Sequence, residues 1–520
     1  MAALAVAAGS CSPHAGEVTT SGAQGEAHTF VLHIRVSGNG AVVPGGLGRA
    51  CTDDCSFRAL RGKTVELRAL EREDVFHRWR GRCGQAPTCR VKMSSDVHVR
   101  AEFGLDRYEP AWVMPFTSSE CVLVNHVAAE QQVLFAGSFT GMATLGGATL
   151  TSGTEGDAVI SALRRENGAI EWVRQFGGSS SDHAAAPAAS PAHGIVAGLS
   201  VSDGARVGAS LVTAREEIVA WIDDDGGAIA RHAVVSGTIE AIARLDDGSA
   251  VVLTDRAGNA HVTRFDAIAG APRWSTDLTA TQRLSAGDLA IGPGGDVFVV
   301  GQIAGSPRFG SFSRSSASSR ASRRPFVARL DQATGSVKLA RWVDVDASHT
   351  VHRLASDGRQ LIATGASNRD AMPAFVIAMS LDGSVRWQRH YRGVDGESSV
   401  FISALVAWPA GAIVAGTIEG ELELRHRRVG QRRTTSSFIL ELSPDGDELW
   451  SYAMPAAAGE LRAVARDADG DLYVVGGFRD PFTFGGKTVA PHPSGRPCSS
   501  AYVAKLVRTG DRSPTAIERR

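Results

Sequence analysis

The chain has 520 residues, with 43% hydrophobic side chains, 58 glycines and a formal net charge of -1. Its length predicts two or three domains rather than one small core. The near-neutral charge excludes a global electrostatic attraction to nucleic acid or to an anionic membrane. The longest apolar runs fall short of the ~18–20 residues that a membrane-spanning helix requires.

Residues 1–11 end in Cys11, which follows the small, apolar run MAALAVAAGS. The segment resembles the end of a bacterial lipoprotein signal, in which a cysteine after small residues is acylated. It departs from that pattern because it begins without Lys or Arg and because Ala8 replaces the usual Leu. A start codon assigned too late would explain the first difference, and an ordinary N-terminus with a stray cysteine is the alternative. The resemblance implies an exported outer-membrane lipoprotein that faces the periplasm or the cell surface.

A small β module is predicted for residues 28–104, because apolar and polar residues alternate there in several short runs. The stretch resembles the divergent internalin-type B repeat of bacterial surface proteins. The matching residues are Gly38, Gly40, Val42, Cys51, Cys55, Gly62, Val65, Leu67, Phe76, Trp79, Gly81, Cys83, Cys89, Val91 and Met93. The resemblance implies a β-grasp-like stalk or surface module without catalytic residues. Residues 12–27 before it predict a flexible tether, and residues 511–520 predict a disordered tail.

Four cysteines of this module, Cys51, Cys55, Cys83 and Cys89, allow two interpretations. Zinc sites usually pair cysteines separated by about two to four residues, and the Cys83–Cys89 spacing is loose for such a site. A small module in an exported chain is more naturally held together by disulfides. We therefore favour the local pairs Cys51–Cys55 and Cys83–Cys89 over zinc, while the two other connectivities stay open.

Two sequence phrases alternate after Gly104. The first is a β-hairpin, in which two apolar runs flank a turn such as Asp469-Gly470. The second is a strand, a glycine-containing turn and a further strand that often carries Trp. Seven hairpin phrases occur, near residues 121–139, 184–200, 239–254, 284–303, 351–366, 400–418 and 460–478. Four antiparallel strands per repeat predict an all-β fold with a seven-bladed β-propeller over residues 108–510, and six or eight blades stay open.

The last repeat has a third strand at 501–511 with no fourth strand after it. We expect Ala111–Phe116, which has the pattern of the missing strand, to complete the last blade and close the ring. Cys121 and Cys498 lie just outside the ends of these two strands, so antiparallel pairing would bring them together. If Cys11 is acylated, six cysteines remain, and this even count favours a Cys121–Cys498 disulfide over two free thiols.

The strands GAIEWVRQF, GSVRWQRHY and GDELWSYAM resemble the tryptophan strands of quinoprotein-type propellers. That family includes quinone-dependent dehydrogenases and a lipoprotein of outer-membrane assembly. The dehydrogenases also need a vicinal cysteine pair, which the propeller sequence lacks. We therefore expect each Trp to pack between blades, and we predict no cofactor. The run Asp467-x-Asp469-Gly-Asp471 lacks the Gly and Glu of a calcium loop, so it predicts a hairpin turn and no metal site.

Two arginine-rich loops, 313–325 and 425–437, lie between the second and third strands of blades four and six. Connections in equivalent places leave a propeller at the same face, so these two predict one basic patch for an anionic polymer. Two solvated insertions are the alternative, since charge runs usually face solvent. The arginines concerned are Arg314, Arg320, Arg323, Arg324, Arg425, Arg427, Arg428, Arg432 and Arg433.

The sequence thus predicts a monomeric, non-catalytic scaffold of the cell envelope that binds a protein or an anionic polysaccharide on one propeller face. We expect no specific nucleic-acid partner and membrane contact only through the lipid anchor. One alternative is an enzyme that acts on glycans or other polymers through a site built from several propeller loops. Such an enzyme would need two carboxylates about 5–10 Å apart in a pocket that raises their pKa. A further alternative, an outer-membrane assembly factor, rests on analogy of fold.

Overall fold

The computed structural model describes residues 28–37, 40–71, 75–80, 83, 88–104, 108–153, 155–190, 194–223, 226–309, 323–345, 349–367, 373–394, 398–424, 428–493 and 500–509. These ranges consist almost entirely of β-strands, turns and connections. Their helical elements are two single turns, η1 (Pro293–Gly295) and η2 (Ala456–Ala458). The described residues include no helix long and apolar enough to cross a membrane. The prediction of an all-β propeller fold is confirmed by the sheets described below.

Two sheets packed face to face form the N-terminal module, with strand orders β3-β1-β7-β5 and β2-β4-β6. The strands are β1 (Thr29–Ser37), β2 (Gly40–Pro44), β3 (Asp54–Leu60), β4 (Thr64–Glu71), β5 (Val75–Arg80), β6 (Thr88–Lys92) and β7 (Val97–Gly104). Alternate residues of both sheets, among them Leu32, Val65 and Trp79, form one buried cluster. Disulfides join Cys51 to Cys55 and Cys83 to Cys89 beside this cluster, which is the local pairing expected from the cysteine spacing.

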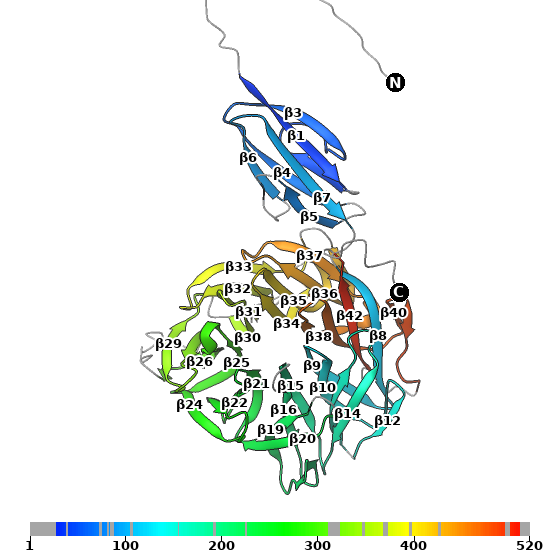
Figure 1. Ribbon diagram of the computed structural model, residues 1–520, viewed down its shortest axis with the longest axis vertical. Coiled ribbons are helices and arrows are strands. Elements are labelled where there is room, and N and C mark those ends of the chain that lie inside the picture. Colours follow the sequence, from blue (N-terminus) through cyan, green and yellow to red (C-terminus); the bar gives the residue numbers. More distant parts are fainter. Residues whose placement is uncertain are drawn as a thin grey trace, which may run out of the picture.

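Seven sheets of the described residues each contain four consecutive antiparallel strands, and Figure 1 shows them arranged in a ring. We call them blades 1 to 7, and the first strand named in each is the innermost. Blade 1 consists of β9 (Cys121–Ala129), β10 (Val133–Thr140), β13 (Asp157–Leu163) and β14 (Ile170–Phe176). Blade 2 consists of β15 (His183–Ser190), β16 (Gly194–Val201), β19 (Glu216–Ile222) and β20 (Ile229–Val235). Blade 3 consists of β21 (Thr238–Arg244), β22 (Ala250–Asp255), β23 (Ala260–Phe265) and β24 (Pro272–Ala280). Blade 4 consists of β25 (Arg283–Ile291), β26 (Val297–Ala304), β28 (Arg324–Leu330) and β29 (Val337–Trp342).

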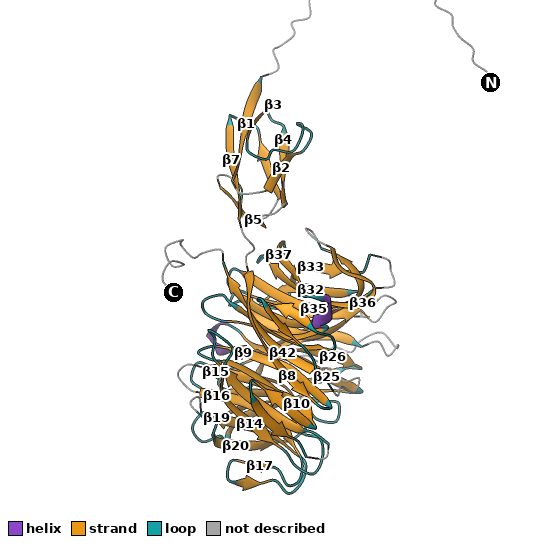
Figure 2. Ribbon diagram, turned by 90° about the vertical axis from the view of Figure 1, so that its right-hand side faces the viewer, coloured by secondary structure: helices purple, strands orange, loops and turns teal. Residues whose placement is uncertain are grey.

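The remaining blades complete the ring, which Figure 2 shows from its side. Blade 5 consists of β30 (His349–Ser356), β31 (Gln360–Ser367), β32 (Ala374–Ser380) and β33 (Val385–Tyr391). Blade 6 consists of β34 (Ser399–Trp408), β35 (Gly411–Glu423), β36 (Arg428–Leu442) and β37 (Glu448–Ala453). Blade 7 is β38 (Glu460–Arg466), β39 (Leu472–Phe478), β42 (Ser500–Arg508) and β8 (Tyr108–Ser118). Innermost strands of neighbouring blades contact one another all the way round, from β9 to β38 and back to β9.

The two ends of the propeller sequence meet in blade 7. Strand β8, which precedes blade 1, pairs antiparallel with β42, with Phe116 opposite Ala501. Figure 1 shows these strands side by side although they come from opposite ends of the colour scale. The expected closing strand is therefore present, and it is longer than the predicted segment Ala111–Phe116. Cys121 begins β9 and is disulfide-bonded; its predicted partner Cys498 lies outside the described residues, as does Cys11.

Tryptophans of the outer strands tie neighbouring blades together. In three blades the indole Nε1 donates a hydrogen bond to a carbonyl oxygen in the turn between the third and fourth strands of the next blade. The pairs are Trp112 with Arg165 (3.0 Å), Trp274 with Gln332 (2.8 Å) and Trp387 with Pro444 (2.8 Å). A glycine of the same turn packs on the ring: Gly335 has φ of 70°, and a Cβ there would collide with Trp274. The tryptophans thus pack between blades.

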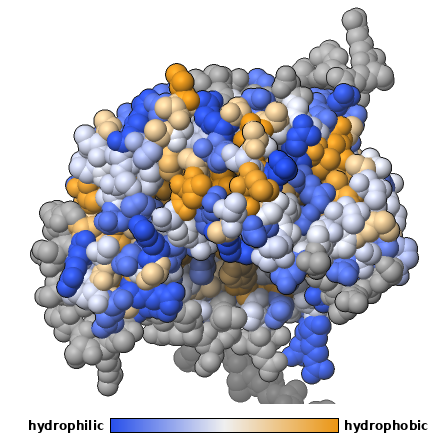
Figure 3. Space-filling model, turned by 90° about the horizontal axis from the view of Figure 1, so that it is seen from below, coloured by the Kyte–Doolittle hydropathy of each residue, from blue (hydrophilic) through white to orange (hydrophobic). Residues whose placement is uncertain are grey.

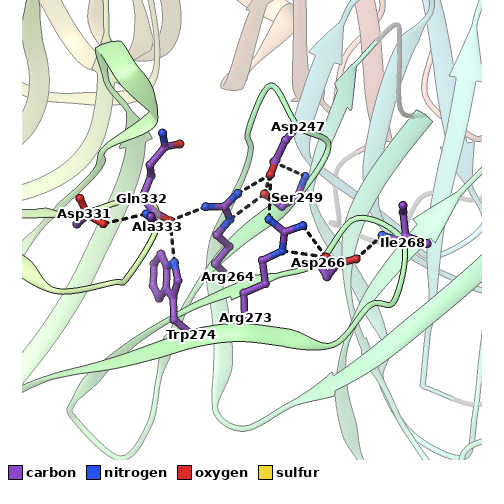
Figure 4. A network of polar contacts seen from close by, with 10 residues as sticks. All are labelled: Asp247, Ser249, Arg264, Asp266, Ile268, Arg273, Trp274, Asp331, Gln332 and Ala333. Carbon is purple, nitrogen blue, oxygen red and sulfur yellow. Dashed lines mark hydrogen bonds and ion pairs between the residues drawn. The ribbon is translucent and has the colours of Figure 1, made fainter.

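A buried arginine strengthens the joint between blades 3 and 4 (Figure 4). Arg264 of β23 is 6% exposed, and its guanidinium donates to the carbonyl oxygen of Gln332 (2.5 Å) and to Asp247 Oδ2 (2.5 Å). Arg273 then links Asp247 (3.2 Å) to Asp266 (2.6 Å). Because the carboxylate of a hairpin turn neutralises this buried cation, the charge can be held inside the blade interface.

Hairpin segments between the second and third strands reach back to the preceding blade. Strands β11 (Met142–Leu145) and β12 (Ala148–Thr151) of blade 1 extend the sheet of blade 7, because β11 pairs with β8. Strand β27 (Pro307–Arg308) of blade 4 pairs with β24 of blade 3. Two further hairpins are β17 (Arg206–Val207) with β18 (Ser210–Leu211) and β40 (Phe482–Phe484) with β41 (Lys487–Val489).

Candidate binding site at the centre of the ring

Each innermost strand carries a β-bulge, at which the register with the second strand shifts once. A bulge leaves an extra residue unpaired and turns its side chain in a new direction. In blade 2 the shift lies between Ala185 and Ala188. In the other blades the extra residues are Asn125, Glu240, Gly287, His352, Ser403 and Arg462. These six residues line the central cavities described below.

A glycine in the second strand makes room for the bulge in five blades. A Cβ at Gly365 would overlap the carbonyl oxygen of Thr350, and one at Gly416 would overlap that of Phe401. Gly137, Gly301 and Gly476 meet the first strand of their blades in the same way. The glycine that recurs in the hairpin phrase is therefore required by the close approach of two strands and not by a turn.

The innermost strands surround a cavity of about 700 Å³, which we call the funnel. Six blades contribute to it. Its lining residues are Asn125, His126, His183, Ala185, Ile239, Glu240, Arg353, Ser399, Phe401, Ser403, Thr417, Glu419, Thr435, Glu460, Leu461 and Arg462. His183, Ser399 and Glu460 are the first residues of their innermost strands, so the funnel lies toward the end of the ring where these strands begin. Connections between second and third strands reach this same end, because adjacent strands are antiparallel.

Two smaller cavities share lining residues with the funnel and bring the described parts of both arginine-rich segments to it. The first, about 330 Å³, shares Glu240 and Arg353 with the funnel and adds Arg323 of the first segment. The second, about 600 Å³, shares Glu460 with the funnel and adds Thr434 of the second segment.

The other predicted arginines lie in different surroundings. Arg324 is in β28, with its guanidinium 4.9 Å from the centre of the Trp342 ring. The second segment is not wholly a loop: Arg428 of β36 pairs opposite Glu423 of β35, whereas Arg432 and Arg433 lie in the unpaired stretch 431–434 of the same long strand, where Arg433 has φ of 62°. All three are exposed. Arg314, Arg320, Arg425 and Arg427 lie outside the described residues.

The funnel combines an exposed aromatic ring with neutral hydrogen-bonding groups. Phe401 is 49% exposed, and its ring lies 5.9 Å from that of His352. Burial, Arg353 and His183 lower the pKa of His126 to about 4, so this imidazole is neutral at neutral pH. A neutral imidazole offers one hydrogen-bond donor and one acceptor. The wall therefore presents an apolar ring between groups that suit hydroxyl partners.

Two arginines provide fixed positive charge in the wall. Arg353 donates from Nε to the carbonyl oxygen of Ser403 in the next blade (2.9 Å). Arg462 pairs with Glu460 (3.2 Å), and its side chain is 18% exposed. Its buried Nη1 has no hydrogen-bond partner among the described residues. Both guanidinium groups thus have N–H donors beyond those used in the contacts named here.

No family model matches this chain, and no curated protein matches it. Among solved structures, it is similar to BamB from Moraxella catarrhalis, with 14% identity over 75% of this chain and 95% of the other and a TM-score of 0.36. It is similar to the β-propeller domain of the Trilobed protease from Pyrococcus furiosus, with 12% identity over 72% of this chain and 100% of the other and a TM-score of 0.40. The Dos1 propeller matches with 9% identity over 78% of this chain and 96% of the other and a TM-score of 0.42.

Two central carboxyl groups have raised pKa values, but they lie in different environments. Burial, with Asp255 and Glu217 nearby, raises the pKa of Glu240, which faces the funnel. Burial also raises the pKa of Asp288 to about 6, although Arg353 opposes this. Asp288 accepts hydrogen bonds from the backbone N–H groups of Leu289 (2.8 Å) in its own strand and of Leu354 (2.9 Å) in β30, so one of its oxygens connects two strands. Glu240 is therefore open to a ligand, whereas Asp288 joins blade 4 to blade 5.

The pKa of Asp288 predicts how stability depends on pH. Since its folded-state pKa exceeds the unfolded value of about 3.9, the folded state binds the proton more tightly. The tighter proton binding of the folded state stabilises the fold by about 3 kcal/mol. This stabilisation is fully present below about pH 4 and is lost as pH rises through about 6. Asn has no titrating proton, so we expect the free energy of unfolding of Asp288→Asn, minus that of the wild type, to increase as pH rises from 4 to 6. Calorimetry measures this difference. A constant difference across that range would contradict this. Aspartates whose pKa is lowered, such as Asp266, act below pH 4 and cancel in the comparison.

The aspartates of the hairpin turn at 467–471 are engaged within the protein. Asp467 accepts from the N–H of Asp471 (2.9 Å) and from the Tyr473 hydroxyl (3.0 Å). Asp471 pairs with Lys505 (2.9 Å). These carboxylates thus stabilise the hairpin turn and neutralise Lys505 on β42, the third strand of the same blade. Across the described ranges, His, Cys, Asp and Glu side chains form no group of three that could hold a metal ion.

The outer surface of blades 2 and 3 has no single broad apolar area in view (Figure 3). Figure 3 shows apolar side chains there in separate groups among polar ones. Exposed apolar residues of these blades include Leu211 (55% exposed), Val234 (57%) and Ile268 (85%). Scattered residues of this kind are usual on soluble surfaces. The funnel is therefore the stronger candidate for a binding site.

Proposed function

We propose that the protein is an exported, non-catalytic scaffold of the cell envelope that binds a polysaccharide in its funnel. The observation that carries this proposal is the combination in one cavity of the half-exposed ring of Phe401 with hydrogen-bonding side chains from six blades. A sugar ring has an apolar face for an aromatic side chain and a rim of hydroxyl groups for polar ones. Pockets that combine apolar surface with a few placed polar groups bind small ligands or polymer units.

Binding fits the funnel better than hydrolysis does. Glycosidic cleavage needs two carboxyl groups that both reach the substrate. Glu240 faces the funnel with a raised pKa, but both oxygens of Asp288 accept backbone hydrogen bonds, and Asp288 does not line the cavity. Asp288 is thus committed to joining two blades, and of the two other carboxyl groups in the funnel lining, Glu419 and Glu460, the latter is ion-paired with Arg462.

Export is supported by the oxidised cysteines. The Cys51–Cys55 and Cys83–Cys89 disulfides and the bonded Cys121 favour an oxidising compartment such as the periplasm or the cell surface. We propose Cys11 as the lipid anchor and the outer membrane as the location of the protein.

The test is binding of the full chain to an array of bacterial envelope oligosaccharides, followed by titration calorimetry of the strongest ligand. Phe401→Ala should weaken that affinity about tenfold, because it removes the ring on which a sugar would stack. Ile268→Ala, which removes an exposed apolar side chain outside the funnel, should bind within about twofold of the wild type. Absence of binding to any glycan, or equal losses for the two variants, would refute the proposal.

A further inference from the structure

Three arginines stand in a row across the exposed face of the first sheet of the N-terminal module. Arg35 on β1 is directly opposite Arg100 on β7, and Arg100 is directly opposite Arg80 on β5. Neighbouring strands lie about 4.8 Å apart, so the three side chains leave the sheet close together. Their exposed fractions are 64%, 47% and 58%, respectively. We call this set the arginine row.

Like charges directly opposite each other destabilise a sheet, so the row is costly unless anions offset it. Two carboxylates of the module do so in part. Asp54, beside Arg35, accepts from its Nε (2.9 Å) and Nη2 (2.8 Å). Glu102 pairs with Arg80 (2.5 Å) and lies 3.7 Å from Arg100. Three guanidinium groups therefore face two carboxylates, and Arg100, in the middle of the row, has the weakest ion pair.

A stacked histidine pair lies next to the row on the same face. His33 and His98 are opposite each other on β1 and β7, with ring centres 4.4 Å apart and planes inclined by 6°. Ser56 shares a hydrogen bond with His33 Nδ1 (2.9 Å). Together with the arginine row, these residues line a cavity of about 570 Å³. The face is thus a hollow with excess positive charge and several hydrogen-bond donors.

We propose that the arginine row binds the phosphate or sulfate esters of an anionic glycan. Guanidinium groups bind tetrahedral oxyanions through paired N–H donors, and such an ester would offset the repulsion within the row. Three cations in line match a polymer with successive charged groups, and the hollow shape favours a glycan over a flat membrane surface. This site is separate from the funnel and does not depend on the function proposed for it.

The test is titration calorimetry of the full chain with a heparin hexasaccharide at low and at physiological salt. Arg100→Ser should weaken binding at least about tenfold and reduce its salt dependence, because it removes the central cation. Its thermal stability should equal or exceed that of the wild type, since the variant removes a cation that lies directly opposite two others. If Arg100 served only to stabilise the fold, Arg100→Ser would lower the thermal stability instead.

Two controls locate the effect. Arg90→Ser removes an exposed arginine paired with Glu66 on the second sheet, and Phe401→Ala alters the funnel. Each should bind heparin within about twofold of the wild type. If Arg100→Ser fails to fold, Arg80→Ser provides the same comparison. Wild-type affinity of the arginine-row variant, equal loss in Arg90→Ser, or binding to phosphatidylglycerol vesicles but not to heparin would overturn the proposal.

Discussion

Replacing Trp274 with alanine should lower the free energy of unfolding by about 3–5 kcal/mol. Trp274 is 9% exposed, packs against Gly335 of blade 4 and donates to the carbonyl oxygen of Gln332. The variant would leave a cavity at the joint between blades 3 and 4. The Gln332 oxygen would keep its hydrogen bond from Arg264, so most of the loss should come from packing.

Trp274→Phe tests the two contributions, because it retains an aromatic ring and removes the indole donor together with a smaller part of the ring system. We expect it to cost about 1–2 kcal/mol, of which about 1 kcal/mol is the usual net value of one hydrogen bond. Calorimetry of the full chain at constant pH measures both variants. If Trp274→Ala unfolded like the wild type, or if both variants lost equally, packing of tryptophan between blades would not be the main source of cohesion at this joint.

Removing the disulfide of Cys121 should be the second large effect. The bond joins Cys121 at the start of β9 to a partner that we predict to be Cys498, shortly before β42. A link between these positions would close a loop of several hundred residues, worth about 6 kcal/mol in the chain-entropy model. We therefore expect Cys121→Ser to lower the unfolding temperature of the propeller clearly, as followed by calorimetry without reductant.

The partner of Cys121 can be verified independently. Cys498→Ser should lose as much stability as Cys121→Ser, and the double variant should lose no more than either one, because all three lack the same bond. Cys55→Ser breaks a disulfide in the other module and should leave the propeller transition unchanged. A non-reducing peptide map of protein from its native cells reads the bond directly, and it also reports whether Cys11 carries lipid. A free thiol at Cys498 would contradict the pairing.

Much of the fold could be predicted because local patterns repeat. The Asp469-Gly470 turn and its flanking apolar runs form the expected hairpin of β38 and β39, with Gly470 at φ of 88°. The closing strand at 111–116 could be recognised since a repeat ended without its fourth strand. The hairpin signal lies within about 20 residues, where turn chemistry and alternation are informative, and the closing strand followed from the count of strands per repeat.

The funnel could not be predicted in the same way, because its residues come from six blades and meet only after the ring closes. Glu240, Arg353 and Arg462 follow no shared motif. One signal was present, however. In five blades the glycine of the hairpin phrase, such as Gly365 or Gly476, lies opposite the bulge whose extra residue faces the centre. Counting back from that glycine along the first strand would have identified part of the lining, but not Glu240, because β22 has no glycine.

The arginine row escaped prediction for a related reason. Arg35, Arg80 and Arg100 are far apart in sequence, and only the parallel pairing of β1 with β7 aligns two of them. The contiguous arginine-rich segments attracted attention instead, yet part of the second pairs as a strand, with Arg428 opposite Glu423. Charge density along the chain is a poor guide to charge density on a sheet surface.

The most direct test of glycan binding in the funnel is hydrogen–deuterium exchange of the full chain, with and without the strongest oligosaccharide from the array. We expect slower exchange at the beginnings of β15, β34 and β38 and around the bulges of β21 and β30, with little change in the outer strands. Protection confined to the outer strands or to the N-terminal module, at a ligand concentration that saturates binding, would contradict the account.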